Sequence, residues 1–243
     1  MFQRNQIILL RILLKIKMSK KINFDEYASN YTAITQKKLN FFNNSRDYFD
    51  VYKVKITKKI FFKPARILDY GCGIGLCVKY LKIEFPDSEI YGTDLSKESL
   101  KIAKSENPFL NIVDLDNLSN YKFDLIFVAG VFHHIEPKNR HDVFSTLNNL
   151  LDNNGGLIIF EHNPFNFITK KLVSECPYDE GVELIKMSNL QSLFNFNDLN
   201  IVDKGYTLFF PSFLSFLRKF EIYLKSFFLG GQYYIAGKKK YDF

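Results

Sequence analysis

The stretch RILDYGCGIGLCVKYL, residues 66–81, joins a short apolar strand to a helix through three alternating glycines. Gly71, Gly73 and Gly75 let the backbone turn sharply and lie against a ligand, because no Cβ atom stands in the way. The helix that follows offers unpaired N–H groups at its start. The stretch therefore predicts a strand, a turn and a helix that bind a nucleotide-like ligand, although the same turn also recurs as a purely structural element of α/β folds.

The spacing of the glycines distinguishes between ligands. A dinucleotide fingerprint reads G-x-G-x-x-G and needs glycine or alanine where this chain has Leu76. The stretch instead resembles the first motif of the class I S-adenosylmethionine (SAM)-dependent methyltransferases, acidic-x-Gly-x-Gly-x-Gly, which Asp69 and the three glycines match. The resemblance implies that SAM is the cofactor and that the glycine turn lies against its amino-acid end.

Strands and helices alternate along the chain after a helical stretch at 24–63. We expect strands at 66–70, 89–93, 110–113, 123–128 and 156–160, and helices at 75–84, 96–105 and 139–151. Gly155 and Gly156 are expected to end a helix and start the next strand. Such alternation predicts an α/β fold with a doubly wound, mostly parallel sheet. Two further strands, 201–209 and 232–237 with a long helix between them, would complete the family's seven strands with an antiparallel last strand.

Length and composition predict a single domain, because 243 residues with 47% hydrophobic residues can bury one sizeable core. Within 18–243 we expect a helical lid at 24–63, a cofactor-binding core at 64–163 and an acceptor-side segment at 164–243. Residues 1–17 hold four of the seven net positive charges, and we interpret them as a non-core extension before Met18. An amphipathic surface-binding helix is the alternative for this extension.

The three cysteines, Cys72, Cys77 and Cys176, show no C-x-x-C spacing, so the sequence supports neither a disulfide framework nor a zinc site. We therefore expect a cytoplasmic protein without a metal. Cys176 belongs, with Asp179, to the segment in which the resembling family varies its acceptor pocket.

Asp94 ends the second expected strand, at the distance from the glycine turn that is typical of an acidic ribose ligand. It could instead cap the next helix, but Ser96 can serve as that N-cap. The resemblance also places an acidic side chain beside the adenine amino group at the end of the third strand. Asp114 matches that position and Asp116 competes with it. The remaining cofactor positions that the resemblance implies are Cys72, Leu95, Leu115, Ala129 and Tyr31.

Two strand ends supply the candidate catalytic side chains. FDLIFVAGVFHHI, residues 123–135, ends in His133 and His134, and an imidazole can accept a proton from an acceptor hydroxyl near neutral pH. Because neighbours in an extended segment point in opposite directions, we expect at most one ring to face the cofactor, and we favour His134. IIFEHNPFN, residues 158–166, adds Glu161, His162 and Asn163, which we expect to face the acceptor.

Later segments suggest the acceptor. The E-H-N-P run, CPYDEG at 176–181 and LFFP at 208–211 resemble a methyltransferase subset, related to quinone-biosynthesis methyltransferases, that is met among saccharide and lipid-linked biosynthesis proteins. This resemblance implies a small-molecule acceptor, most simply a hydroxyl of a saccharide or lipid-linked intermediate. Residues 212–229 are apolar with basic interruptions, which is typical of peripheral contact with the inner membrane surface or, alternatively, of a cover helix or dimer contact.

Two other functions compete with this interpretation. A SAM-fold protein could bind the cofactor without turnover. A nucleic-acid methyltransferase is disfavoured, because AGVFHH stands where a base-amine enzyme carries N/D-P-P-Y/F, and no basic stripe interleaved with aromatics lies outside the two ends. We therefore expect no nucleic-acid partner, and the sequence leaves the oligomeric state and the methylated atom open.

Overall fold

The computed structural model describes residues 24–28 and 47–239. The expected extension at 1–17 and the expected cofactor residue Tyr31 lie outside these residues. Of the expected helical lid, the structure describes α2 (Phe24–Tyr27) and α4 (Tyr48–Ile60).

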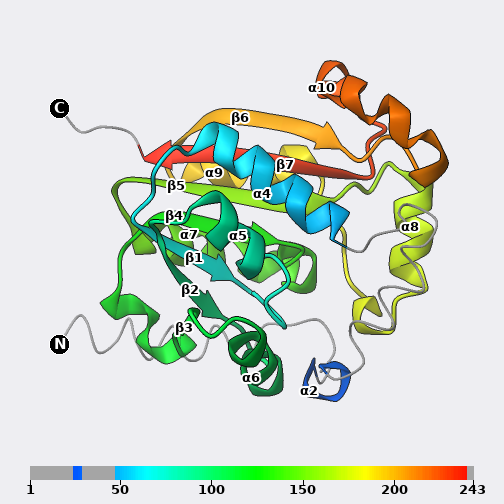
Figure 1. Cartoon of the computed structure of the whole chain (residues 1–243). Coiled ribbons are helices and arrows are strands. Elements are labelled where there is room, and N and C mark those ends of the chain that lie inside the picture. Colours follow the sequence, from blue (N-terminus) through cyan, green and yellow to red (C-terminus); the bar gives the residue numbers. More distant parts are fainter. Residues whose placement is uncertain (1–23, 29–46, 240–243) are drawn as a thin grey trace.

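Seven strands form one sheet in the order β3-β2-β1-β4-β5-β7-β6 (Figure 1). Their bounds are Arg66–Tyr70 for β1, Glu89–Thr93 for β2, Asn111–Ile112 for β3, Phe123–Ala129 for β4, Leu151–His162 for β5, Leu199–Thr207 for β6 and Gln232–Lys239 for β7. The first five pair in parallel, whereas β7 runs antiparallel to both β5 and β6. The expected doubly wound sheet with an antiparallel last strand is confirmed.

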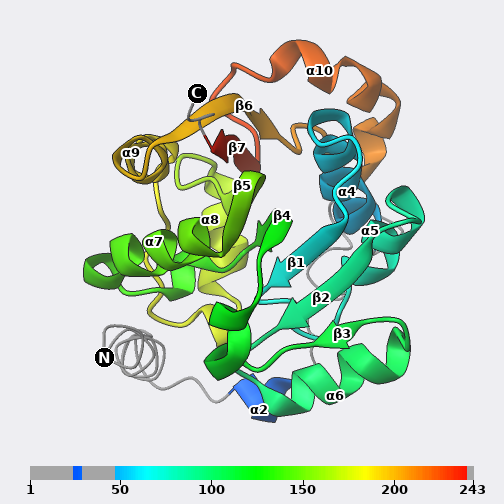
Figure 2. The same cartoon turned by 90° about the vertical axis from the view of Figure 1, so that its left-hand side faces the viewer.

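Helices cover both faces of the sheet. Figure 2 shows α4, α5 (Val78–Glu84) and α6 (Lys97–Glu106) on one side, and α7 (Arg140–Leu150) and α9 (Met187–Phe196) on the other. Side chains alternate along each strand, so neighbours on β1 enter different cores: Ile67 packs with the α4 side and Leu68 with the α7 side. Both residues are fully buried, as is typical of a parallel strand covered on two faces.

The glycine turn is longer than expected. We predicted a helix from residue 75, but α5 begins at Val78. Gly71, Gly73 and Gly75 have φ values of 74°, 52° and 80°, which a right-handed helix excludes. The three left-handed residues therefore extend the turn before the chain can become helical.

The glycine pair after α7 has a different role from the expected helix cap. The helix ends at Leu150 and β5 begins directly at Leu151, so Gly155 and Gly156 lie inside the strand. A Cβ atom on Gly156 would overlap the Phe61 ring, which follows α4. Glycine at this position allows the end of α4 to approach the sheet closely.

The segment between β6 and β7 is not the single long helix that we predicted. Residues Ser212–Phe220 form 3-10 turns interrupted at Leu214, and the short α10 follows at Glu221–Leu224. Glu221 is buried and accepts backbone N–H bonds from Leu208, Phe209 and Phe210, which folds the segment back onto the end of β6. Two helices were missed, α8 (Phe167–Ser174) and α9. Over the described ranges, none of the helices has the length and apolar character needed to cross a membrane.

Candidate functional site

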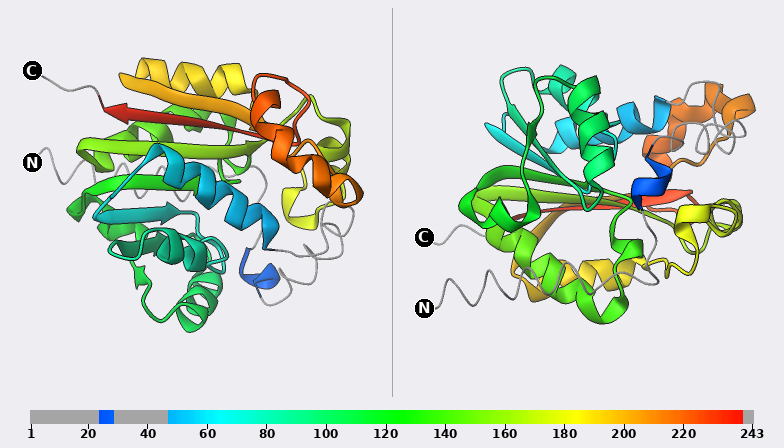
Figure 3. Two further views of the ribbon diagram at one scale, coloured as in Figure 1. Left: turned by 45° about the horizontal axis from the view of Figure 1, so that its top comes forward. Right: turned by 90° about the horizontal axis from the view of Figure 1, so that it is seen from below.

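A cavity of about 380 Å³ opens where the parallel strands β1, β2, β4 and β5 end. This size falls in the usual range for small-molecule sites. Figure 3 shows α2, α8 and α10 gathered at the same end of the sheet. In open α/β sheets ligands bind beyond the carboxyl ends of the strands, so this cavity is the candidate site.

Two of the three glycines face the cavity. A Cβ on Gly71 would lie 2.5 Å from the Val131 side chain, whereas no atom lies within 4 Å of the Cβ position on Gly73, where a side chain would enter the open space. The Gly75 position is different, because its Cβ would stand 2.8 Å from the Asn107 amide nitrogen and 3.1 Å from the Ala103 Cβ. Gly75 therefore packs the turn against α6, and its expected contact with the cofactor stays a prediction.

Asp94 connects the end of β2 to the glycine turn. Its Oδ2 accepts a hydrogen bond from the Gly73 N–H (2.8 Å) and its Oδ1 accepts one from the Ser96 N–H (2.9 Å). Ser96 caps α6, since its hydroxyl accepts from the Ser99 N–H. Burial raises the pKa of Asp94 despite these bonds. Because each carboxylate oxygen accepts more than one hydrogen bond, Asp94 can still receive a ligand hydroxyl from the cavity.

Three carboxyl groups, those of Asp50, Asp69 and Asp94, lie beside the glycine turn. Burial, followed by the Asp94 and Asp50 carboxylates, raises the pKa of Asp69 to about 8. Lys53 from α4 lies 3.5 Å from Asp50 and also lines the cavity. Burial opposes the charge of Lys53, but Asp50 raises its pKa above the ordinary value. With Asp69 protonated at neutral pH, a ligand that brings positive charge to this place would favour ionisation of its carboxyl group.

Sequence reasoning missed Asp50 and Lys53, because it treated the 24–63 stretch only as a lid. Their i, i+3 spacing on one helix face was the available signal.

The structure brings only some of the other expected cofactor residues to the cavity. Cys72, Leu95, Leu115 and Ala129 line the cavity. Asp114 is exposed and lies outside the lining, so its contact with the adenine amino group stays a prediction.

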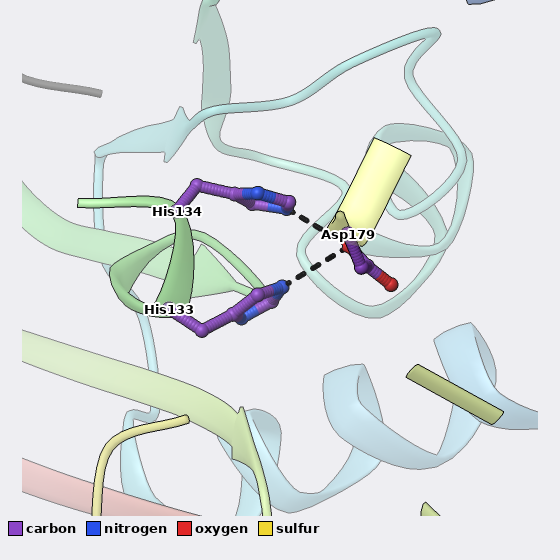
Figure 4. A group of neighbouring side chains, drawn as sticks. All are labelled: His133, His134 and Asp179. Carbon is purple, nitrogen blue, oxygen red and sulfur yellow. Dashed lines mark ion pairs between the residues drawn. The ribbon is translucent and has the colours of Figure 1, made fainter. Parts of the chain in front are cut away.

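The two adjacent histidines both line the cavity, although we expected the extended segment to turn at most one ring toward the cofactor. His133 and His134 lie in a 3-10 turn, Phe132–His134, and not in an extended segment, so consecutive side chains diverge by about 120° and not by 180°. Their ring centroids lie 4.1 Å apart, and Figure 4 shows both rings directed at Asp179. The His133 and His134 Nε2 atoms lie 3.6 Å and 3.4 Å from Asp179 Oδ1.

Glu161 holds this turn in place. One carboxylate oxygen accepts backbone bonds from Val131 (3.0 Å) and Phe132 (2.6 Å), and the other lies 2.7 Å from His133 Nδ1. The side chain is fully buried. We expected Glu161 to face the acceptor as a catalytic group, but its oxygens are engaged by the protein, which favours a positioning role.

Charge is unevenly shared among these groups. Burial opposes protonation of His133, but Glu161 and Asp179 outweigh it and raise the pKa of His133 to about 10. Burial and the neighbouring charge on His133 lower the pKa of His134 to about 3. Burial works against the charge of Asp179, yet the neighbouring His133 lowers the pKa of Asp179 to about 2. At neutral pH a charged His133 thus lies between two carboxylates, with a neutral His134 beside it.

The end of β5 divides into a cavity residue and a structural residue. His162 lines the cavity, its ring centroid lies 5.1 Å from that of His133, and burial lowers its pKa to about 4. Asn163 does not face the acceptor as expected. Its side chain is fully buried and donates to the Phe228 and Gly230 carbonyls, both at 2.7 Å. These bonds connect the end of β5 to the chain that enters β7.

Comparisons with known proteins indicate the kind of domain that carries this cavity. Residues 68–157 match the model of a family described as a methyltransferase domain. An uncharacterized protein of Rickettsia prowazekii is 37% identical over 103 residues, which are 38% of this chain and 41% of that protein. A malonyl-[acyl-carrier protein] O-methyltransferase of Legionella pneumophila is 31% identical over 143 residues, 52% of this chain and 50% of that protein. The matches therefore span half or less of these two relatives.

A solved structure of a SAM-dependent methyltransferase from Archaeoglobus fulgidus has the same fold, with a TM-score of 0.65 at 16% identity over 86% of this chain and 99% of that chain. The family match over residues 68–157, the strand order and the glycine turn with Asp94 at the adjoining strand end agree with a methyltransferase domain of the class I SAM-dependent type.

Proposed function

We propose that the protein transfers a methyl group from SAM to an oxygen atom of a small-molecule acceptor. The observation that carries this proposal is that one cavity joins the glycine turn and Asp94 to the polar group of His133, His134 and Asp179. Cofactor residues on one side of a cavity and titratable side chains on the other are what a transfer reaction requires.

The side chains at the glycine turn fit SAM. The open space at the Gly73 Cβ position lets the backbone lie against the ligand, and Asp94 can accept its ribose hydroxyls. SAM would bring its positively charged sulfonium and ammonium groups to the carboxyl groups around Asp69, where they favour ionisation of that residue, and Lys53 complements the SAM carboxylate. When bound, SAM supplies an activated methyl group on a good leaving group. The protein has to align the acceptor and remove its proton.

His134 remains our candidate for the base. Its Nδ1 atom is buried without a hydrogen-bond partner among the described residues, and its Nε2 atom points at Asp179. Its lowered pKa keeps the imidazole unprotonated at neutral pH, so it can accept the proton of an acceptor hydroxyl, but as a weaker base than an ordinary histidine. Glu161 acts indirectly, by fixing the turn that carries both histidines.

For the acceptor we propose a saccharide or lipid-linked intermediate. The Legionella relative, named for an O-methyltransferase reaction on malonyl-[acyl-carrier protein], supports oxygen as the methylated atom. Apolar side chains on the segment before β7 support the lipid-linked form, since Phe216, Ile222 and Tyr223 are 66%, 61% and 78% exposed beside the basic Lys219. Such a surface suits peripheral contact with a membrane that holds the acceptor.

The test begins with calorimetry of the whole chain with SAM and S-adenosylhomocysteine, followed by transfer of labelled methyl to saccharide, polyprenyl-linked and acyl-carrier-protein acceptors. We expect both nucleosides to bind. We also expect His134→Ala to slow turnover about 10²- to 10⁴-fold while SAM still binds. Failure of a folded protein to bind SAM would refute the proposal, and SAM binding without turnover on any acceptor class would favour the non-catalytic alternative.

A further inference from the structure

The geometry points to a metal site within the same cavity: we propose that His133, His134 and Asp179 bind a divalent transition-metal ion. We predicted no metal from the sequence, because the cysteines lack ligand spacing. The structure instead brings two imidazoles and one carboxylate together, with one donor atom from each residue lying within 4.8 Å of the other two. This inference rests on the proposed function only for the role of the ion, not for its binding.

The distances suit ligands of a common ion better than hydrogen-bonded partners. Zinc-type ions bind imidazole nitrogen and carboxylate oxygen at about 2.0–2.2 Å, so two tetrahedral ligand atoms lie about 3.3–3.6 Å apart. The two Nε2 atoms lie 3.6 Å and 3.4 Å from Asp179 Oδ1. An N–H···O hydrogen bond would draw the same atoms to about 2.9 Å. Figure 4 shows both rings turned toward Asp179, so the three donor atoms face one another across a short gap.

One of the proposed ligands, His133, already has its other ring nitrogen held by a buried carboxylate. Metal-binding histidines usually donate the other ring N–H to a carboxylate, which fixes the tautomer and the ring orientation. His133 Nδ1 lies 2.7 Å from Glu161 Oε2, and Glu161 is anchored by two backbone N–H groups. This arrangement leaves His133 Nε2 facing Asp179 and available as a ligand. The His134 ring is fixed by packing, since Phe24 of α2 lies edge-on against it at 5.5 Å between centroids.

The charge of the cluster favours a cation. Two buried carboxylates, Glu161 and Asp179, lie within 2.7 Å and 3.6 Å of the two ring nitrogens of His133. Two imidazoles with one carboxylate form the ligand set of zinc and ferrous sites, whereas magnesium and calcium prefer oxygen ligands.

Three protein ligands leave coordination positions for a further oxygen. Because His133, His134 and Asp179 all line the cavity that holds the cofactor residues, those positions are open to an acceptor hydroxyl. An ion at this point would orient that oxygen and lower its pKa, so that its proton is lost to solvent before the methyl group arrives. In this form of the reaction His134 acts as a ligand and not as the base.

The experiment uses Co²⁺ as a spectroscopic probe and Zn²⁺ as a competitor, added to the chelator-treated whole chain. We expect Co²⁺ to bind in a 1:1 ratio with visible absorption bands, and Zn²⁺ to displace it. His134→Ala and Asp179→Asn should each weaken Co²⁺ binding at least tenfold. Glu161→Gln should weaken it about 10- to 100-fold, because Glu161 orients the His133 ring. His141→Ala is the matched control, because His141 is a partly exposed histidine on α7 outside the cavity.

Several results would overturn the proposal. Absence of Co²⁺ bands in the folded wild-type chain would do so without any variant. Equal loss of binding in His141→Ala would indicate non-specific uptake, and loss in Cys176→Ser with retention in Asp179→Asn would move the ion to a thiol. SAM binding by the chelator-treated chain separates the two hypotheses: metal binding without SAM binding would contradict the proposed function alone, and SAM binding without metal binding would contradict this inference alone.

Discussion

Replacing Glu161 with glutamine should destabilise the protein far more than an exposed Glu→Gln change. The substitution keeps the shape of the side chain but replaces one carboxylate oxygen with an NH2 group. Glu161 accepts from the Val131 and Phe132 N–H groups through Oε1 and contacts His133 through Oε2. With its NH2 group at the Oε1 position, glutamine would face two backbone N–H donors, and with it at the Oε2 position the carboxylate charge beside His133 Nδ1 would be lost.

The magnitude follows from burial. The side chains of Glu161 and His133 are 0% and 2% exposed, so solvent cannot replace the lost bond. Removing one partner of a buried pair typically costs about 3–5 kcal/mol, because the other partner is left uncompensated. A domain with the usual stability of about 5–15 kcal/mol would remain folded at this cost but with a reduced margin.

Urea unfolding in the presence of a chelator measures this loss, and Glu183→Gln provides the control. Glu183 is 69% exposed and lies 3.9 Å from Arg140, so its loss should cost about 0–1 kcal/mol. For Glu161→Gln the unfolding midpoint should fall by at least about 1 M urea. If the two variants shifted the midpoint equally, Glu161 would not hold the histidine turn, and the positioning role assigned to it would be wrong.

Three further predictions concern the cofactor side of the cavity. Asp94→Ala should weaken SAM binding by about 1.5–3 kcal/mol, the scale of charge-assisted hydrogen bonds, and unchanged calorimetric affinity would contradict the ribose role. Gly73→Ala and Gly181→Ala should each cost about 1–2 kcal/mol of stability, because both residues have positive φ and open space around the Cβ position. Only Gly73→Ala should also lower the affinity for SAM. Equal SAM affinities of the two variants would show that the turn does not touch the cofactor. Because the folded-state pKa of Asp69 is raised to about 8, its contribution to stability is complete below its unfolded pKa and is lost as pH rises toward 8; thermal unfolding of the cofactor-free chain should therefore show Asp69→Asn gaining stability relative to wild type over that interval, and a constant difference would contradict the raised pKa.

The strands were predictable because apolar runs bounded by glycine, proline and asparagine specify them locally. The bounds of β1 and β2 agree with the sequence expectation to the residue. The errors arose where tertiary contacts determine the local structure. The start of α5 depends on three left-handed residues, and the place of Gly156 depends on the Phe61 ring, which lies far away in the sequence.

The site was predictable where two contacting residues stand at a spacing that a known motif fixes. Asp94 and Gly73 follow from motif spacing, and the structure joins them by a hydrogen bond. Asp179 meets His134 only through α8 and the turn that follows it, and a single sequence holds no signal for such a contact. The expectation of an extended segment at the two histidines was wrong for a local reason. The strand ends at Ala129, and the chain has entered a 3-10 turn by Phe132.

The three polar residues of the E-H-N run at the end of β5 have different roles, and the difference bears on which acceptors the cavity can take. Glu161 fixes the histidine turn and Asn163 fixes the entry to β7, so two of its three polar residues support the frame of the site. The third, His162, faces the cavity together with Cys176 and Tyr178 from the segment after β5. Substitutions in that later segment can therefore change the acceptor pocket without disturbing the frame, whereas substitutions at Glu161 or Asn163 should impair every acceptor alike.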